Sequence, residues 1–209
     1  NKEGKSDFVD SVGELVAMCE REGFIPRYAT DIPQDKVDIT LKDMNNYVRN
    51  AYLKTLENVV HNSCKIKCPV INMHLNPGIY FTLPTEKVFL FEKYNEYYEF
   101  CVDEFINFSK NEMKNLDFKP LLSIENTNGW KSFEKISLDK ILKYDNFALT
   151  FDIGHSESIG NFDEQFILEH KSKLKHFHIH DGTLPNSVTK SFGKNHLELG
   201  TGSIDLLGR

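Results

Sequence analysis

Four side chains that can bind a divalent metal or transfer a proton recur along the chain: His74, Glu125, Asp152 and His178. Each ends a short apolar run of the kind that forms a buried strand. A mixed set of two carboxylates and two imidazoles suits Mn, Mg, Co or Zn and can also move protons. The order therefore predicts one site built from the ends of successive strands.

Histidine is concentrated in the same half of the chain. Alternation along the run 174–180 places His176, His178 and His180 on one face, where a carboxylate or metal is expected to meet at least one of them. Other roles compete for the remaining histidines. A hydrogen-bonded core position is favoured for His176, a loop pair with Asp181 for His180, and exposed helix positions for His61 and His170.

Apolar periodicity predicts helices and strands that alternate. Helices are expected over 11–23, about 40–62, 86–115, 138–142 and 163–174, and strands over 24–29, 69–74, 120–125, 147–152 and 174–178. Such alternation indicates βαβ units and a parallel sheet, either doubly wound or closed as a (β/α)8 TIM barrel. In both folds the carboxyl ends of the strands meet at the rim where chemistry takes place.

Composition excludes several classes of protein. The 209 residues suffice for one domain with a sizeable core. A net charge of -6, with no Lys/Arg run longer than two, disfavours nucleic acid as a partner. The chain lacks an apolar stretch long enough to span a membrane, so no membrane partner is expected.

Three further sequence features concern the cysteines and two glycine-containing segments. A chain of this size does not need disulfides, so the four cysteines are interpreted as reduced thiols in a cytoplasmic protein. The Gly-Thr-Gly at 200–202 lacks the strand-then-helix context of a dinucleotide-binding loop. The segment 126–129 is interpreted as a turn.

Five segments follow one another in the order found in the xylose isomerase-like TIM-barrel superfamily, which includes sugar and sugar-phosphate epimerases and isomerases as well as endonuclease IV. They are NMHLNPG at 72–78, SIENTNG at 123–129, TFDIGH at 150–155, HIHD at 178–181 and HLELGTGSID at 196–205. Each motif alone is modest, but five in order are specific for the superfamily. The sequence thus resembles these proteins, and the resemblance implies a TIM barrel.

The resemblance also implies roles for individual residues. Glu125, Asp152 and His178 resemble three of the four ligands of the epimerase metal site, and Glu125 also matches one acid/base carboxylate. His155 resembles a residue that contacts substrate in epimerases and a further zinc in endonuclease IV. His74 and His196 match histidines near the same rim, so that substrate binding is expected of His74, His155 and His196.

Three departures from the family pattern bear on these expectations. The fourth ligand, a Glu on the last barrel strand that is also the partner acid/base, would lie beyond Arg209. Arg27 or Tyr28 stands where endonuclease IV has a His, and Lys194 where it has an Asp, which disfavours a three-zinc nuclease site. The motif order assigns strands two to six, so residues 1–209 are expected to be a single barrel domain lacking the first strand and the last two.

The function expected from the sequence is that of a divalent-metal-dependent isomerase or epimerase of a small sugar or sugar phosphate. The ion would polarise the carbonyl, and Glu125 would transfer a proton through an enediolate. Two alternatives stay open: an endonuclease IV-like zinc phosphodiesterase acting on abasic DNA, and a catalytically inactive barrel that binds a sugar. A homo-oligomer is compatible with the sequence.

Overall fold

The computed structural model describes residues 46–75, 80–84, 87–127, 129–189 and 191–206. The helix expected at 11–23, the strand expected at 24–29, and Cys19, Arg27 and Tyr28 lie outside the described residues. The elements are α2 (Asn46–Lys65), β1 (Val70–His74), β2 (Tyr80–Thr82), β3 (Lys87–Phe89), α3 (Leu90–Lys93), α4 (Asn95–Met113), β4 (Leu121–Glu125), α5 (Ser132–Ile141), β5 (Phe147–Asp152), α6 (Ile153–Ile159), α7 (Glu164–Glu169), the 3-10 turn η1 (Lys171–Lys173) and β6 (Leu174–His178).

Four strands form one parallel sheet in the order β1-β4-β5-β6. Each strand lies beside the next main strand of the chain, without the reversal of order that a doubly wound sheet has at its switch point. The register pairs His74 with Glu125 and Asp152 with His178. The prediction of a parallel α/β fold is therefore confirmed, and the strand order is that of a barrel segment.

Alternation along the strands separates an apolar face from a polar face. The apolar face belongs to the core, with buried side chains from β1, β4 and β5: Ile71, Met73, Leu122, Ile124, Phe147 and Leu149. The opposite face carries polar side chains, among them Asn72, Ser123 and Thr150, and the hydroxyls of the last two lie 2.7 Å apart. The sheet thus directs its chemistry-bearing residues away from the core.

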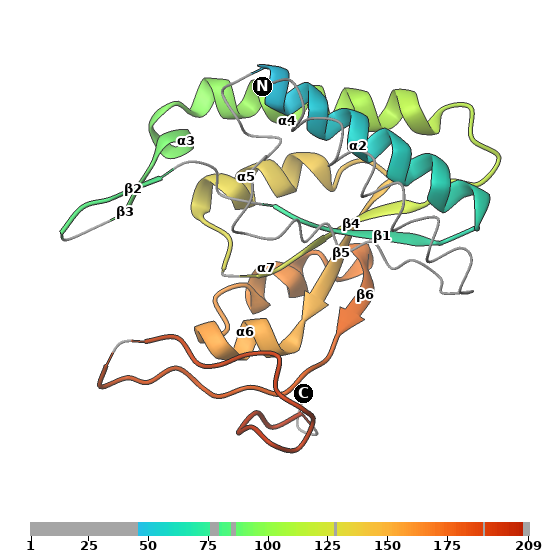
Figure 1. Ribbon diagram of the computed structural model, residues 1–209. Helices are drawn as coiled ribbons and strands as arrows, with labels where there is room; N and C mark the ends of the chain where they lie inside the picture. Colours follow the sequence, from blue (N-terminus) through green and yellow to red (C-terminus); the bar gives the residue numbers. More distant parts are fainter. Residues whose placement is uncertain (1–45, 76–79, 85–86, 128, 190, 207–209) are drawn as a thin grey trace, which may run out of the picture.

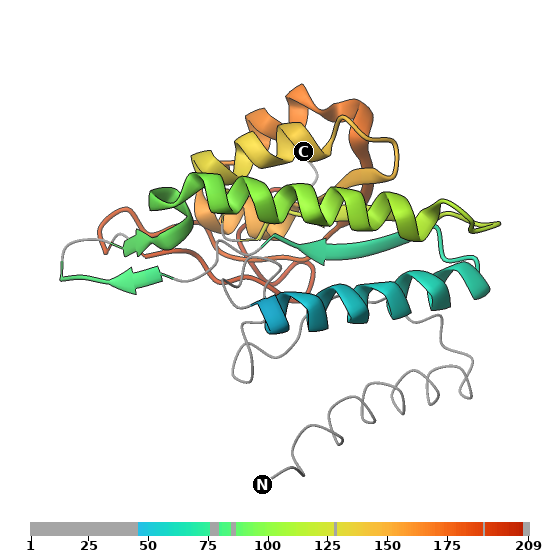
Figure 2. The same cartoon turned by 90° about the horizontal axis from the view of Figure 1, so that it is seen from above.

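Three helices cover the apolar face. Helices α2, α4 and α5 lie together over the sheet (Figure 1), and α4 runs between the other two (Figure 2). Tyr98 and Leu138 are fully buried at this interface. This packing holds the strands rigidly and leaves their carboxyl ends to the loops.

The helix expected over 86–115 is wrong at its beginning. Residues 87–89 form β3, which pairs antiparallel with β2 in a hairpin that projects from the rest of the molecule (Figure 1). Tyr94 has φ −118° and ψ 58°, which separates α3 from α4. Phe91 and Tyr98 pack across this break, with ring centroids 5.1 Å apart.

Other helices also differ from the sequence-based expectation, and the helix expected over 163–174 is divided into α7 and η1. Helix α5 begins six residues earlier than expected, because the Glu134 side chain accepts the N–H of Lys131 at 2.9 Å and caps the first turn. Helix α6 follows β5 directly and was not expected. It ends at Gly160, whose φ of 91° is the left-handed conformation that favours glycine.

His61 and His170 lie outside the site, as expected, but each is half-buried and paired rather than simply exposed. His61 Nε2 lies 3.4 Å from Glu112 Oε2, which links α2 to α4. His170 Nε2 lies 3.0 Å from Asp139 Oδ1, and its ring stacks on Phe166. Both histidines therefore stabilise helix packing.

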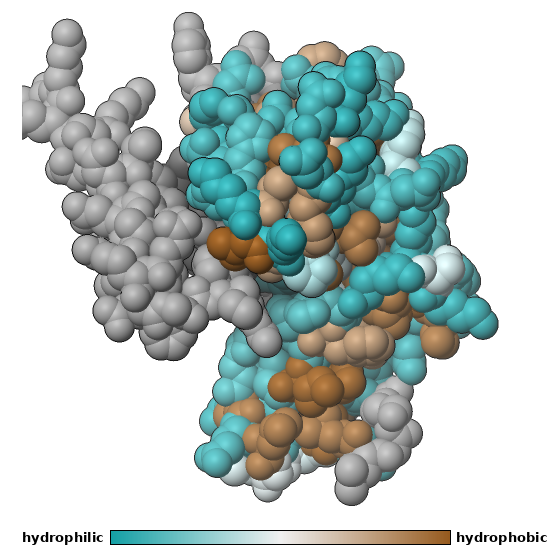
Figure 3. All heavy atoms as spheres, turned by 90° about the vertical axis from the view of Figure 1, so that its right-hand side faces the viewer, coloured by the Kyte–Doolittle hydropathy of each residue, from teal (hydrophilic) through white to brown (hydrophobic). Residues whose placement is uncertain are grey.

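Apolar side chains gather on the outer side of β6, at the edge of the described sheet. Phe177 is 51% exposed and Ile179 58%. Figure 3 shows apolar surface over the lower half of this face, where Figure 1 places β6 and the C-terminal segment. Among the described residues, Cys64, Cys68 and Cys101 are free thiols, and none of the helices there combines the length and apolarity needed to cross a bilayer.

Candidate metal and acid–base site

The four residues that the sequence predicts to form one site are the last residues of four neighbouring strands. His74 ends β1, Glu125 ends β4, Asp152 ends β5 and His178 ends β6. Because parallel strands present their carboxyl ends at one edge, the four side chains converge there. The structure thus brings together the residues that the spacing predicted.

Glu125 is the buried centre of this group, with 2% of its surface exposed. Its Oε1 lies 3.1 Å from Nδ1 of His178, and its Oε2 lies 3.2 Å from Nε2 of His74. The Asn72 amide donates a short hydrogen bond to the same Oε2. Burial raises the pKa of Glu125, but the hydrogen bonds from His74 and Asn72 outweigh it and hold the pKa below its ordinary value. Glu125 is therefore an oriented carboxylate.

Asp152 is equally buried, but only one of its two carboxylate oxygens accepts a hydrogen bond from the described residues. Its Oδ1 accepts the N–H of His155 at 2.8 Å, which caps α6. Its Oδ2 has no hydrogen-bond partner among the described residues and lies 3.6 Å from His178 Nδ1. Burial raises the pKa of Asp152, and the nearby Glu125 charge raises it further. The hydrogen bond from the His155 N–H and the charges of His180 and His178 act in the opposite direction but are outweighed. An acceptor left unpaired in this way can accept a metal ion.

The side chain of Asn126 fixes the backbone of Asp152. Its Oδ1 accepts the Asp152 N–H at 2.8 Å, and its Nδ2 donates to the Asp152 carbonyl at 3.1 Å. These two bonds continue the β4–β5 ladder by one residue beyond Glu125. The segment 126–129 was interpreted from sequence as a turn, but Asn126 in fact positions a site residue.

His155 enters the site from the first turn of α6. Its Nε2 lies 3.9 Å from Asp152 Oδ2, and its Nδ1 lies 3.2 Å from the Asn195 amide. Burial lowers the pKa of His155 to about 4, with the Glu125 charge opposing and the neighbouring His196, His180 and His74 adding to the effect. His155 is therefore neutral near pH 7, the form that can ligate a metal.

The C-terminal segment is folded around Asp181, whose carboxylate accepts four backbone N–H groups. The donors are Gly182, Gly200, Gly202 and Ile204. These bonds, that of Gly202 first, lower the pKa of Asp181. The Gly-Thr-Gly segment thus wraps around a carboxylate of its own chain.

His196 is brought to the site by the same segment. Its backbone N–H donates to His180 Nδ1 at 2.9 Å, and its ring stacks on that of His180. All six predicted site residues therefore lie in one cluster: His74, Glu125, Asp152, His155, His178 and His196. His176 is half-buried on the inner face of β6, with its ring edge against His178 at a centroid distance of 5.0 Å.

Sequence reasoning missed three contributors to the cluster. Asn72 lies two residues before His74, so strand alternation could have placed it on the same face. His180 was expected to be a loop residue, yet its Nε2 lies 3.0 Å from Asp152 Oδ1. Asn126 carries no local signal, because only the neighbouring strand gives its amide a role.

The donor set fits a divalent metal. Two groups of three donors have ligand atoms within 4.8 Å of one another: Glu125, Asp152 and His155, and His155, His180 and His196. The combination of buried carboxylates, imidazoles and the unpaired Asp152 Oδ2 suits Mn, Mg, Co or Zn. The sequence predicts His178 as the imidazole ligand beside the two carboxylates, and this assignment stays a prediction. In the structure, His155 also lies close enough to both carboxylates.

Comparison with known proteins relates the fold to solved structures. No protein-family profile matches the chain, and no curated protein sequence does. A xylose isomerase domain protein from Planctomyces limnophilus superimposes with a TM-score of 0.53 and 14% identity, over 79% of this chain and 54% of that one. The 3-keto-D-glucoside 4-epimerase from E. coli superimposes with a TM-score of 0.59 and 14% identity, over 96% of this chain and 71% of that one.

The chain thus spans little more than half the length of the first of these proteins and under three quarters of the second. At this level of identity the likeness concerns the fold. The chain has an α/β fold with a parallel sheet and alternating helices, a partial TIM-barrel-like arrangement that matches structures of the xylose isomerase-like type.

Proposed function

We propose that the protein is a divalent-metal-dependent isomerase or epimerase of a small sugar or sugar phosphate, acting in the cytoplasm. The observation that carries the proposal is the convergence of Glu125, Asp152 and His178 at the ends of three adjacent parallel strands. The fold of the E. coli 3-keto-D-glucoside 4-epimerase supports the same class of reaction.

Glu125, Asp152 and His178 would hold the ion. When bound, such an ion supplies Lewis-acid polarisation of a substrate carbonyl. The site has what this needs from the chain, namely two carboxylates and an imidazole in a buried setting, with an unpaired oxygen on Asp152. The remaining coordination positions would be left for substrate oxygens.

Glu125 would move the proton at the carbon beside the carbonyl. Asn72 and His74 hold its Oε2, and His178 faces its Oε1, so the carboxylate has one orientation. Near neutral pH the carboxylate is ionised, which is the form that can bind a cation or accept a proton. His74, His155 and His196, which surround the carboxylates, would bind the hydroxyl groups of the substrate.

The experiment that tests this function is Glu125→Gln, assayed on a panel of ketoses and ketose phosphates in deuterated water. The wild type should epimerise or isomerise at least one sugar and incorporate deuterium at the carbon beside the carbonyl. Glu125→Gln should lower both rates by about 100-fold to 10,000-fold, the usual contribution of a general base. Full activity in this variant would refute the assignment.

Glu134→Gln is the matched control. Glu134 is also buried, but it lies on α5, where its side chain accepts the Lys131 N–H at the beginning of the helix. A glutamine oxygen can accept that N–H equally well. The control should therefore keep both activity and thermal stability.

The alternative of a zinc phosphodiesterase predicts a different result in the same preparation. Such a protein would cleave an abasic duplex and leave every sugar in the panel unchanged. The proposed function predicts no cleavage of the abasic duplex.

A further inference from the structure

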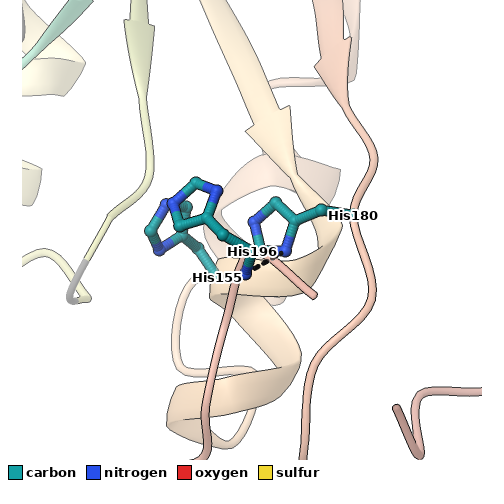
Figure 4. Close-up of side chains that lie close together, drawn as sticks. All are labelled: His155, His180 and His196. Carbon is teal, nitrogen blue, oxygen red and sulfur yellow. Dashed lines mark hydrogen bonds between the residues drawn. The ribbon is translucent and has the colours of Figure 1, made fainter. Parts of the chain in front are cut away.

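Three imidazoles lie beside Asp152, and they come from three separate parts of the chain. His155 lies in α6, His180 directly follows β6, and His196 lies in the C-terminal segment (Figure 4). The rings of His180 and His196 stack with their centroids 4.2 Å apart. The Nε2 atom of His180 is buried and makes no hydrogen bond to the described residues. Which of its two ring nitrogens carries the proton therefore decides what His180 does.

The surrounding backbone fixes the tautomer of His180. The His196 N–H donates to Nδ1 of His180 at 2.9 Å, the dashed line in Figure 4, so Nδ1 must offer a lone pair. Nδ1 also lies 3.0 Å from the Asp181 carbonyl. That oxygen already accepts the Leu197 N–H at 2.9 Å, so it does not need the imidazole as a donor. An imidazole with a lone pair on Nδ1 carries its proton on Nε2.

The protonated Nε2 of His180 faces the carboxylate of Asp152. Nε2 lies 3.0 Å from Oδ1 of Asp152, and the same oxygen accepts the His155 N–H at 2.8 Å. A lone pair on Nε2 at this distance would be repelled by the carboxylate, whereas an N–H dipole is attracted to it even when it is not aligned for a hydrogen bond. Both N–H groups therefore engage Oδ1, and Oδ2 accepts no hydrogen bond from the described part of the chain.

We infer that His180 is a positioning residue for Asp152. Its Nε2–H and the His155 N–H hold Oδ1, so that Oδ2 is the oxygen that Asp152 presents to the ion. His180 acts through its N–H and is not itself a ligand. The inference rests on the proposed function, because it takes Asp152 as a metal ligand, and it names the residue that orients this ligand. Ligating carboxylates are commonly supported by such outer hydrogen-bond donors.

The first turn of α6 makes room for the His180 ring. A Cβ on Gly154 would come within 2.1 Å of Nδ1 and within 2.7 Å of Nε2 of that ring. Glycine is a poor helix former, so the needs of the helix do not explain its place two residues after Asp152. The missing side chain lets the ring reach the carboxylate that caps the helix.

The C-terminal segment holds the other side of the His180 ring. His196 has a φ of 56°, a left-handed conformation that a non-glycine residue keeps only where its surroundings hold it. Its N–H meets Nδ1 of His180, and its ring stacks on the same imidazole. An antiparallel bridge between Asp181 and Leu197 keeps the two segments side by side. His180 thus connects the segment that carries His196 to the carboxylate of Asp152.

The position of the ring proton is tested by two-bond proton–nitrogen NMR spectra of the intact protein with isotope-labelled histidine, recorded without metal and with zinc. The His180 signals are identified by their loss in variants of this residue. The expected result is a proton on Nε2 and a lone pair on Nδ1 in both states. A proton on Nδ1, or zinc bound to Nε2, would overturn the inference whatever the activity of the protein.

The orienting role is tested by the affinity for manganese, measured by titration calorimetry with the metal alone. His180→Leu keeps a bulky side chain but removes the N–H, and it should raise the dissociation constant by about tenfold to 100-fold. His180→Gln, whose amide can still donate to Asp152, should recover most of this loss. His61→Leu is the matched control, because His61 also lies beside a carboxylate, that of Glu112, but in the α2–α4 contact. It should bind manganese as the wild type does.

Gly154→Ala tests the same role without removing a donor. Its methyl group would displace the His180 ring, so we expect a similar loss of manganese affinity while all eight histidines remain. A merely structural role of the ring would lower the melting temperature and leave the dissociation constant of the folded variants unchanged. Unchanged affinity in both His180→Leu and Gly154→Ala would therefore overturn the inference. If these variants do not fold, the ring proton of the wild type decides.

The outcome is separable from that of the proposed function. Glu125→Gln should abolish sugar turnover and leave the proton of His180 on Nε2. A wild type that binds manganese but turns over no sugar, together with lost affinity in His180→Leu, would reject the isomerase and support the positioning role. Sugar turnover with equal manganese affinity in the wild type and His180→Leu would do the reverse.

Discussion

Asp152 and Asp163 are both buried, but they differ in the hydrogen bonds that their carboxylate oxygens accept. Asp163 is fully buried, both of its oxygens lie 3.1 Å from the Trp130 N–H, and Lys135 Nζ lies 3.1 Å from Oδ1. Lys135 also donates to the Phe162 carbonyl. Asp163 therefore fastens the beginning of α7 to α5.

Asp152 has the same burial but faces imidazoles rather than a permanent cation. One oxygen caps α6 and the other has no hydrogen bond from the described residues. Burial raises the pKa of both aspartates. Burial and a shifted pKa thus do not distinguish a structural carboxylate from a functional one, whereas the completeness of the hydrogen bonding does.

Among the variants that test this comparison of the two aspartates, Asp152→Asn should have the largest effect. The amide oxygen can still cap α6, but the charge that attracts a metal is gone. We expect loss of the bound metal and a fall in turnover of about 100-fold or more. This exceeds the usual effect of changing a residue that only hydrogen-bonds to a metal ligand. Metal analysis and the sugar assay measure this, with thermal stability unchanged or higher. Retention of full metal content would contradict the interpretation of Asp152.

Asp163→Asn should give the opposite pattern. Lys135 would lose the negative charge with which it pairs, and Trp130 would keep an acceptor, so we expect a loss of about 1–3 kcal/mol in the free energy of unfolding. Urea denaturation measures this loss. Metal content and turnover of the folded variant should equal those of the wild type. If Asp163→Asn lost metal but kept its stability, the assignment of a structural role to Asp163 and a functional role to Asp152 would be wrong.

Asn72→Ala should have a smaller effect on the site. The substitution removes the amide that holds Glu125 Oε2, while His74 and His178 remain. We expect turnover to fall by about tenfold to 100-fold, as for other residues that orient a metal ligand. Asn72→Asp, measured alongside, should be more harmful because it places a second negative charge against Glu125. Equal activity of all three proteins would exclude this positioning role.

The smallest expected effect is a pH dependence carried by Asp163. Burial raises its pKa above 3.8, against the hydrogen bonds from Lys135 and Trp130. The folded chain then binds this proton more tightly than the unfolded chain. The unfolding free energy of the wild type minus that of Asp163→Asn should therefore fall as pH rises from about 4 through the folded pKa, and level off above it. Denaturation at several pH values measures the difference; a rise with pH would contradict it.

Much of the fold follows from the sequence because periodicity of 2 and of 3.6 residues is local. The four strands that end at His74, Glu125, Asp152 and His178 are expected within a residue or so of where they lie. Their convergence follows from the geometry of parallel strands. The β2–β3 hairpin was missed because its two strands have only three residues each, too few for a periodic pattern. Helix α6 was missed although its N-cap, Asp152, is a local signal.

The candidate site was predictable in its ligands but not in its supports. Motif order identified the six clustered residues, because histidine, glutamate and aspartate can bind a metal or transfer a proton. Strand alternation could have placed Asn72 on the face of His74, but the partners of the Asn72 and Asn126 amides lie on neighbouring strands and are not visible in the sequence. His180 was undervalued because the space that Gly154 leaves for its ring comes from another element.

The central claim is that the buried carboxylates bind a divalent ion together with histidine. Anomalous diffraction from crystals of the intact protein grown with zinc or manganese tests it most directly. The account predicts a peak within about 2.0–2.3 Å of oxygens of both Glu125 and Asp152 and of a nitrogen of His178. Crystals saturated with metal that show no peak between Glu125 and Asp152 would contradict it.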